Sequence, residues 1–130
     1  MAQPAFGLLL QRLREERRLS LRELGQLAEI DHAYIYRLEN GEKESPSEEA
    51  LNKLIRALKA PKREADMLRY LAAHPQVDPG LVGHAITDPT ITIEEFSAAA
   101  GMAFRGAGRP DHAKLIERIR RILKEEEGNG

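Results

Sequence analysis

The sequence predicts an all-α protein, built as a five-helix domain followed by a small helical C-terminal domain. Aromatic residues make up only 5% of the 130 residues, so a core must be built mainly from Leu, Ile and Ala, which suits packed helices better than sheets. Apolar residues recur at helical spacing along most of the chain, and capping residues precede these runs. The one β-like patch, residues 90–93, is short and is better interpreted as the beginning of a helix.

The first two predicted helices cover residues 5–17 and 21–29. The first is amphipathic, with an apolar side formed by Phe6, Leu9, Leu10 and Leu13. Ser20 and Glu23 have the spacing of a capping box and open the second helix. Its predicted apolar face comprises Leu21, Leu24, Leu27 and Ala28.

Three more helices complete the predicted N-terminal domain. Asp31 is an N-cap candidate for a short helix that ends at Asn40, because Gly41 supplies a left-handed C-terminal stop. Pro46 and Ser47 restart a helix rich in leucine that runs to about residue 58. Residues 62–73 form the fifth predicted helix.

The texture of the chain changes after residue 73. Residues 74–80 form a loop with two prolines and a glycine, which predicts a linker between a domain at 1–73 and a domain at 81–130. Asp78 caps a short helix through residue 86, and a second capping box, Thr92 with Glu95, opens a helix to about residue 103. A glycine-rich connector at 106–110 leads to a last helix at 111–126.

Composition excludes several classes of protein. With no cysteine, the chain has no disulfide, thiolate metal site or thiol nucleophile. The four histidines are scattered without metal-ligand spacing, and no glycine-rich phosphate loop is present. We therefore expect no enzyme activity, no metal and no cofactor. No segment has the pattern of a signal peptide or membrane span, so we expect a cytoplasmic protein.

The helices at 21–29 and 31–40, joined by a tight corner at Ile30, predict a helix-turn-helix, in which the second helix lies in the DNA major groove. At about 100° per residue, Ile35 and Leu38 share the core side of helix 31–40. Tyr34 flanks that side, so its ring should pack against the domain and leave its hydroxyl near a phosphate. The residues that point away from the core, or lie at its edge on the first turn, are His32, Ala33, Tyr36 and Arg37.

Residues 10–58 closely resemble the Cro/C1-type (XRE) helix-turn-helix family. The resemblance covers about 60 residues of the chain and is specific. It rests on Arg14, the capped second helix, the run from Tyr34 to Gly41, and Pro46-Ser47 before a leucine-rich helix. It implies a five-helix domain that binds a double-stranded DNA operator, usually as a dimer. The small net charge of −1 argues against coating DNA by bulk charge but not against a few positive groups on one face.

The resemblance also implies residue roles. Arg14 and Glu39 take the places of an internal ion pair between the first helix and the recognition helix. His32, Ala33, Tyr36 and Arg37 occupy or adjoin base-facing positions, where Arg37 can take a guanine and Ala33 a thymine methyl. Implied phosphate contacts are Ser20, Arg22, the Tyr34 hydroxyl, Asn40 and Lys43.

Three positions depart from the family pattern. Leu21 stands where the family often has a phosphate-binding Gln, which removes one phosphate contact. Tyr36 stands where the family has a small polar residue, which predicts an unusual sequence preference. Gly25 stands where the family has Ala, and a glycine inside a helix is unfavourable by roughly 1 kcal/mol.

Residues 81–123 resemble the C-terminal domain of the Deinococcus-type radiation/desiccation-response repressors (the DdrO family), patchily but in order. The matching features are Asp88-Pro89-Thr90, Ile93 at a helix start, the run from Phe104 to Asp111, and Arg121-Ile122-Leu123. The resemblance implies dimerisation through the last helices and cleavage by a zinc metallopeptidase of the IrrE type. The implied scissile bond is Phe104–Arg105, with Phe104 where the family pattern has Leu.

The last helix fits a dimer interface on its own pattern, because it carries an apolar stripe. The stripe comprises Leu115, Ile116, Ile119, Ile122 and Leu123. Two alternatives remain open. Residues 74–130 can be a dimerisation domain without cleavage, with 105–110 as an ordinary interhelical loop. The whole chain can be an XRE-type antitoxin or protein-interaction module with secondary DNA binding, since acidic and basic residues are equally numerous in the first 60.

Overall fold

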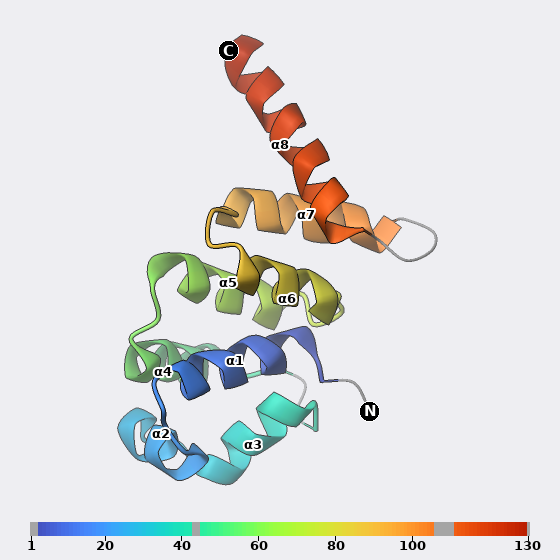
Figure 1. Ribbon diagram of the computed structural model, residues 1–130. Coiled ribbons are helices and arrows are strands. Elements are labelled where there is room, and N and C mark those ends of the chain that lie inside the picture. Colours follow the sequence, from blue (N-terminus) through green and yellow to red (C-terminus); the bar gives the residue numbers. More distant parts are fainter. Residues whose placement is uncertain (1–2, 43–44, 106–110, 130) are drawn as a thin grey trace.

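The computed structural model describes residues 3–42, 45–105 and 111–129, and these residues are all-α, as the sequence predicts (Figure 1). Eight helices lie within them: α1 (Ala5–Glu16), α2 (Leu21–Ala28), α3 (His32–Asn40), α4 (Glu48–Leu58), α5 (Lys62–Ala73), α6 (Pro79–Thr87), α7 (Ile93–Arg105) and α8 (His112–Asn129). Every predicted helix is present, and the ends of α7 and α8 extend a few residues beyond the predicted ones. None of the described helices has the length and apolar character needed to cross a membrane.

Local capping explains where most of these helices begin. The Ser20 side chain accepts from the Glu23 amide while the Glu23 carboxylate accepts from the Ser20 amide, so the predicted capping box is present. The Ser47 hydroxyl accepts from the Ala50 amide at 3.1 Å, and a second reciprocal box joins Thr92 and Glu95. Each cap satisfies amide groups that have no partner inside their own helix.

The helices stack around α1, which contacts α3 on one side and α5 and α6 on the other (Figure 1). The side chains that fill the centre are fully or almost fully buried, and most are leucines: Leu9, Leu10, Leu24, Ile35, Leu38, Leu54, Leu68 and Leu71. The core therefore has the aliphatic composition that the low aromatic content predicts.

The buried core continues across the segment predicted as a linker. Val77, inside 74–80, is only 8% exposed, and Leu81 and Val82 of α6 belong to the same buried cluster as α1 and α5. Arg63 of α5 ties α6 down, because its guanidinium donates to the backbone oxygens of Ala85, Asp88 and Ile91. The division of the chain into two domains at 74–80 stays a prediction. In the structure, α6 packs on the N-terminal helices.

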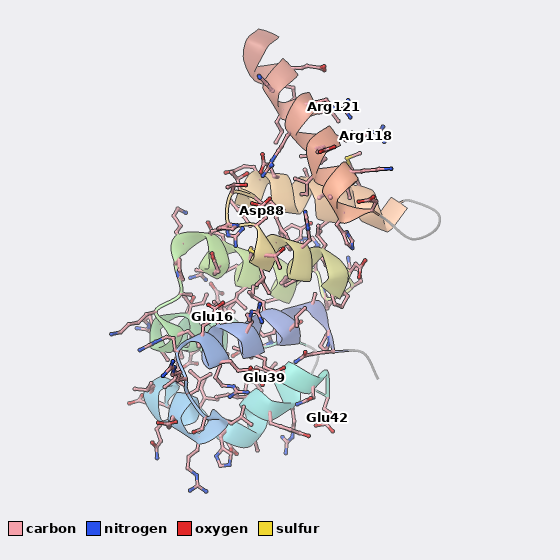
Figure 2. All side chains as sticks on the ribbon, viewed as in Figure 1. Glu16, Glu39, Glu42, Asp88, Arg118 and Arg121 are labelled. Atoms are coloured by element: carbon pink, nitrogen blue, oxygen red, sulfur yellow. The ribbon has the colours of Figure 1, made fainter. Side chains whose placement is uncertain are left out.

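The α8 helix rests on α7 by its first half, and its C-terminal half projects from the body (Figure 1). Ile116 and Ile119 are buried, at 2% and 3% exposure. Arg120 holds the helix in place, because its Nε lies 3.1 Å from Glu95 Oε2 and its Nη2 donates to Thr90 Oγ1. Arg118 and Arg121 lie on the projecting helix (Figure 2).

One predicted core residue is exposed. Leu27 was expected on the apolar face of α2, but 57% of its surface is accessible. Leu24 and Ala28, its neighbours on that face, are buried at 0% and 4% exposure. Leu27 lies about 60° beyond Leu24 around the helix, at the edge of the face that α4 covers.

Candidate nucleic-acid interface

Two short-range features form the turn between α2 and α3: a left-handed residue that ends α2 and an N-cap that begins α3. Glu29 adopts a left-handed backbone conformation, with φ of 57°, and the Ile30 amide donates back to the Gly25 oxygen at 2.9 Å. Asp31 then caps α3, because its Oδ1 accepts from the Ala33 amide at 2.9 Å. The corner therefore turns the chain from α2 into α3 within three residues.

Gly25 lies at the closest approach between α2 and this turn. A Cβ atom added at Gly25 would stand 2.7 Å from the Ile30 oxygen and 3.2 Å from the His32 amide nitrogen. The sequence predicted that Gly25 weakens α2 through low helix propensity. The structure gives the glycine a packing reason, because the turn sits too close for a methyl group without a backbone shift.

The α3 helix has two different faces. Ile35, Leu38 and Glu39 point inward and are almost fully buried, at 0%, 1% and 2% exposure. On the opposite side Tyr36 is 50% exposed, and Arg37 is exposed beside it. Tyr36 and Arg37 therefore lie on the exposed face of α3, the face at which the sequence predicts contacts with base edges.

The remaining base-facing candidates lie around the same surface. His32 is exposed on the first turn of α3, and Ala33 is half-buried next to it. Tyr34 is half-buried and packs against the hydrophobic core, on a different side from Tyr36. Asn40 is exposed at the last turn, where its Nδ2 donates to the Tyr36 oxygen at 2.8 Å.

Arg14 and Glu39 anchor α3 to α1. The Arg14 Nε lies 2.7 Å from Glu39 Oε2 and its Nη2 lies 3.0 Å from Oε1, so the contact is bidentate. The third nitrogen, Nη1, donates to the Leu19 oxygen at 2.9 Å, just before α2. Hydrogen bonding to Glu39 raises the pKa of Arg14 above its usual value. One arginine thus ties together α1, the α1–α2 loop and α3.

The N-terminal end of the chain adds a second anchor that the sequence did not suggest. Gln3 donates through Nε2 to the Glu39 oxygen at 3.0 Å. At Gly7, a Cβ atom would stand 2.2 Å from the same oxygen, so α1 passes very close to the end of α3. Nothing in the local pattern of residues 3–7 signals this role, because the partner lies more than 30 residues away.

Two of the predicted phosphate contacts belong to the start of α2. Ser20 and Arg22 are exposed at the start of α2, and Ser20 lowers the pKa of Glu23 by hydrogen bonding to its carboxylate. Lys43 lies outside the described residues. Gln26, which the sequence does not single out, lines a hollow with Arg22 and His32. Gln26 lies one turn after Arg22 on the polar side of α2, and this spacing places the two side chains next to each other.

The residues predicted for the C-terminal function lie far from this surface. Within the apolar stripe of α8, Ile116 and Ile119 are buried in the chain's own core, whereas Ile122 is 39% exposed. Leu115 and Leu123 are half-buried. Phe104 and Arg105 end α7, but their side chains lie outside the described residues. Among the described residues, no group of three or more acidic or histidine side chains is placed to hold a metal ion.

Comparison with known proteins supports the helix-turn-helix prediction for the first half of the chain. Residues 5–68 match the family model described as a helix-turn-helix domain. The HTH-type transcriptional repressor RghR of Bacillus subtilis (strain 168) is 40% identical over 57 residues, which are 44% of this chain and 42% of that protein. The match thus spans less than half the length of this curated relative. No solved structure matches the chain significantly.

Residues 5–68 therefore form a helix-turn-helix domain, which confirms that part of the Cro/C1-type prediction. The family model ends before α6, so the resemblance of residues 81–123 to the Deinococcus-type repressors has no support from these comparisons.

Proposed function

We propose that the protein is a DNA-binding transcriptional repressor of the cytoplasm, which acts as a homodimer on a palindromic operator. The observation that carries the proposal is the division of α3 into a pinned inner face and an exposed outer face with Tyr36 and Arg37. The helix-turn-helix match and the repressor among its relatives support the same conclusion.

Recognition would combine positioning with base reading. Ser20 and Arg22 at the start of α2, with the Tyr34 hydroxyl, Asn40 and Lys43, would contact phosphates and set the depth of α3. Arg37 would then donate to guanine O6 and N7, and Ala33 would meet a thymine methyl group. Because Arg14 holds Glu39 through two hydrogen bonds, α3 would enter the groove without reorganising first.

Dimerisation would use the projecting part of α8. Ile122 is exposed at 39% and Leu123 is half-buried one position further on. Leu115 contributes from the start of the helix, while Ile116 and Ile119 support the surface from inside. A two-fold dimer presents two α3 helices to two half-sites, and so selects a palindromic operator.

Proteolysis would inactivate the repressor. We propose that a zinc metallopeptidase of the IrrE type cuts at Phe104–Arg105. Such a cut would separate α8 from the rest of the chain at the end of α7. The chain would then lose the buried Ile116 and Ile119 together with the exposed Ile122, and with them the dimer.

A second candidate is an XRE-type antitoxin or protein-interaction module, in which DNA binding is secondary. The observation that favours it is the balance of charge, since acidic and basic residues are equally numerous in the first 60. Such a module would not depend on Arg37.

Selection of bound duplexes from a random pool, at one stated salt concentration, tests the proposal. A repressor should enrich a palindromic motif, and Arg37→Ala should lose preference at one base pair of each half-site by roughly 1–3 kcal/mol. Lys62→Ala, which removes an equally charged and exposed side chain from α5, is the matched control. If the pool yields no motif, or if Arg37→Ala retains the full preference, the second candidate gains.

A further inference from the structure

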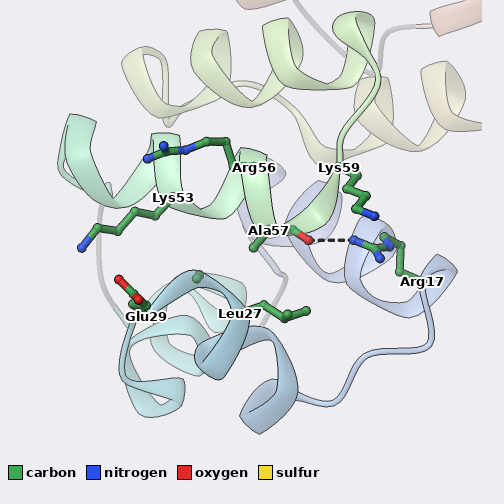
Figure 3. Close-up of a pocket in the computed structure, with 8 residues that line it drawn as sticks. Arg17, Leu27, Glu29, Lys53, Arg56, Ala57 and Lys59 are labelled. Atoms are coloured by element: carbon green, nitrogen blue, oxygen red, sulfur yellow. Dashed lines mark hydrogen bonds between the residues drawn. The ribbon is translucent and has the colours of Figure 1, made fainter.

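A groove of about 500 Å³ opens on the flank of the helix-turn-helix domain, between α2 and α4 (Figure 3). We call it the α2–α4 groove. The residues that define it are Arg17, Leu27, Glu29, Lys53, Arg56 and Lys59, with Ala28 and Ala57 as its small apolar side chains. None of these residues was singled out for a function by the sequence.

The α2–α4 groove is strongly basic. Four cations line it against one carboxylate, that of Glu29. Lys53 pairs with Glu49 one turn earlier on α4, at 3.5 Å, and the contact is weak because the Glu49 side chain is 80% exposed. Within the described part of the chain, no carboxylate forms an ion pair with Arg56 or Lys59.

Helix ends explain part of this charge. The groove lies where α1, α2 and α4 end, and helix C-termini attract cations. Arg17 serves this purpose, because its Nη1 donates to the Ala57 oxygen at 2.7 Å (Figure 3). Arg56 and Lys59 form no such bond to a described group. The groove therefore carries more positive charge than the capping of its own helices uses.

An exposed leucine stands among these cations. Leu27 is the most exposed of the large hydrophobic residues in the described part of the chain, at 57%. It projects from α2 into the space beside Ala57 and Arg17 (Figure 3). Because Ala28 and Ala57 are small, the groove has room for an apolar side chain from outside.

The groove lies away from the face that α3 offers to DNA. Gly25, against which the turn and His32 pack, and Leu27 point in directions about 160° apart around α2. An occupant of the groove therefore leaves α3 accessible. A phosphate backbone would also gain nothing from Leu27, whereas a protein segment that carries both carboxylates and an apolar side chain would use both the cations and the leucine of the groove.

We propose that the α2–α4 groove docks an acidic amphipathic segment of another protein. Its apolar side chain would cover Leu27, and its carboxylates would pair with Arg56, Lys59 and Lys53. The proposal goes beyond operator binding and does not depend on it, because the groove and the α3 face share none of the cations named here.

The test uses the full chain labelled with ¹⁵N and two synthetic peptides of about 14 residues, a length that can form a helix when bound. One peptide carries leucines on one face with glutamates beside them. The other has the same composition in permuted order. We expect saturable shifts of the amides in residues 27–29 and 53–59 with the first peptide, and at least tenfold weaker binding of the second.

Variants separate the groove from general electrostatics. Leu27→Ser and Arg56→Gln should each weaken the first peptide about tenfold, the loss expected for one buried apolar or charge-assisted contact. Lys62→Gln, which removes a 90% exposed cation from α5, should leave binding unchanged. Thermal unfolding checks that each variant is folded.

Three results would overturn the proposal. The first is that the permuted peptide binds as tightly as the amphipathic one, which would show that the groove attracts anions in general. The second is that Lys62→Gln weakens binding of the first peptide as much as Arg56→Gln does. The third is that a short non-operator duplex shifts the resonances of the same groove amides and displaces the peptide, which would show that the groove binds phosphate.

Discussion

Arg14 on α1 and Glu39 on α3 form a bidentate ion pair, at 2.7 Å and 3.0 Å, on the inner side of the helix whose outer side carries Tyr36 and Arg37. Both side chains are well shielded, at 13% and 3% exposure. The pair therefore couples the stability of the domain to the orientation of the surface that we propose for DNA binding.

The first prediction concerns this pair. Arg14→Met leaves the Glu39 carboxylate buried without its partner, so we expect the free energy of unfolding to fall by about 3–5 kcal/mol. The double variant Arg14→Met with Glu39→Met should recover much of this loss, because neither charge is then buried alone. Chemical denaturation of the two variants measures both values. A loss below about 1 kcal/mol in the single variant would show that the pair is an ordinary surface contact.

A second prediction separates phosphate contacts from base reading. Arg22 is exposed at the start of α2, on the helix that precedes α3. Arg22→Gln should weaken binding to all DNA sequences about equally and reduce the slope of log K against log salt by about 1. Titrations of a selected operator and a scrambled duplex at several salt concentrations measure this. A change confined to the selected operator would instead assign Arg22 to base reading.

The third prediction contrasts two helical glycines. A methyl group at Gly7 would collide with the Glu39 backbone, whereas a Cβ at Gly83 has no neighbour within 4 Å. Gly7→Ala should therefore destabilise the protein by about 1–3 kcal/mol through overpacking. Gly83→Ala should stabilise it by up to about 1 kcal/mol through helix propensity. Thermal unfolding of the matched pair measures the difference, and equal effects would contradict the close approach of α1 and α3.

A fourth prediction concerns the seat of α8. Arg120→Gln removes the contacts to Glu95 and Thr90, so amides of α8 should exchange with solvent faster while those of α1 to α5 keep their rates. Arg118→Gln, two residues away on the exposed side of α8, is the control (Figure 2). If both variants exchange alike, Arg120 does not hold the helix.

The fifth prediction tests proteolytic inactivation. Incubation of the protein with a candidate metallopeptidase and zinc or manganese should give two fragments, separated at Phe104–Arg105, and the operator complex should disappear with the intact chain. Mass spectrometry locates the cut, and light scattering follows the oligomeric state. The hypothesis fails if no cut occurs near residue 104, or if the cut protein keeps both its oligomeric state and its operator.

Much of the helical framework could be predicted because its signals are local. In each capping box, such as Ser20 with Glu23 or Thr92 with Glu95, each side chain accepts a hydrogen bond from the other residue's backbone amide. The two residues are three positions apart, so a short window of sequence contains the whole interaction. The opposite placement of Tyr34 and Tyr36 followed from helical geometry in the same way. The relation of Arg14 to Glu39 needed more than periodicity and came from the family resemblance.

Other features depend on distant segments. Leu27 fits an apolar stripe by spacing, yet 57% of it is exposed, because α4 covers only part of that stripe. Ile116 and Ile119 look like interface residues but are covered by the chain's own core. Gln3 reaches Glu39 across 36 positions, and no local pattern could signal that contact.

The sequence by itself determined which segments are helices, where they begin, and which side of α3 turns outward, because these depend on hydrogen bonds and periodicity within a few residues. Only the tertiary structure decided that Gly7 and Gly25 must be small, that Arg63 fastens α6 to α5, and that a basic groove lies open beside Leu27. These features are set by how closely helices from distant parts of the chain approach one another, and that distance is fixed by the packing of the whole core.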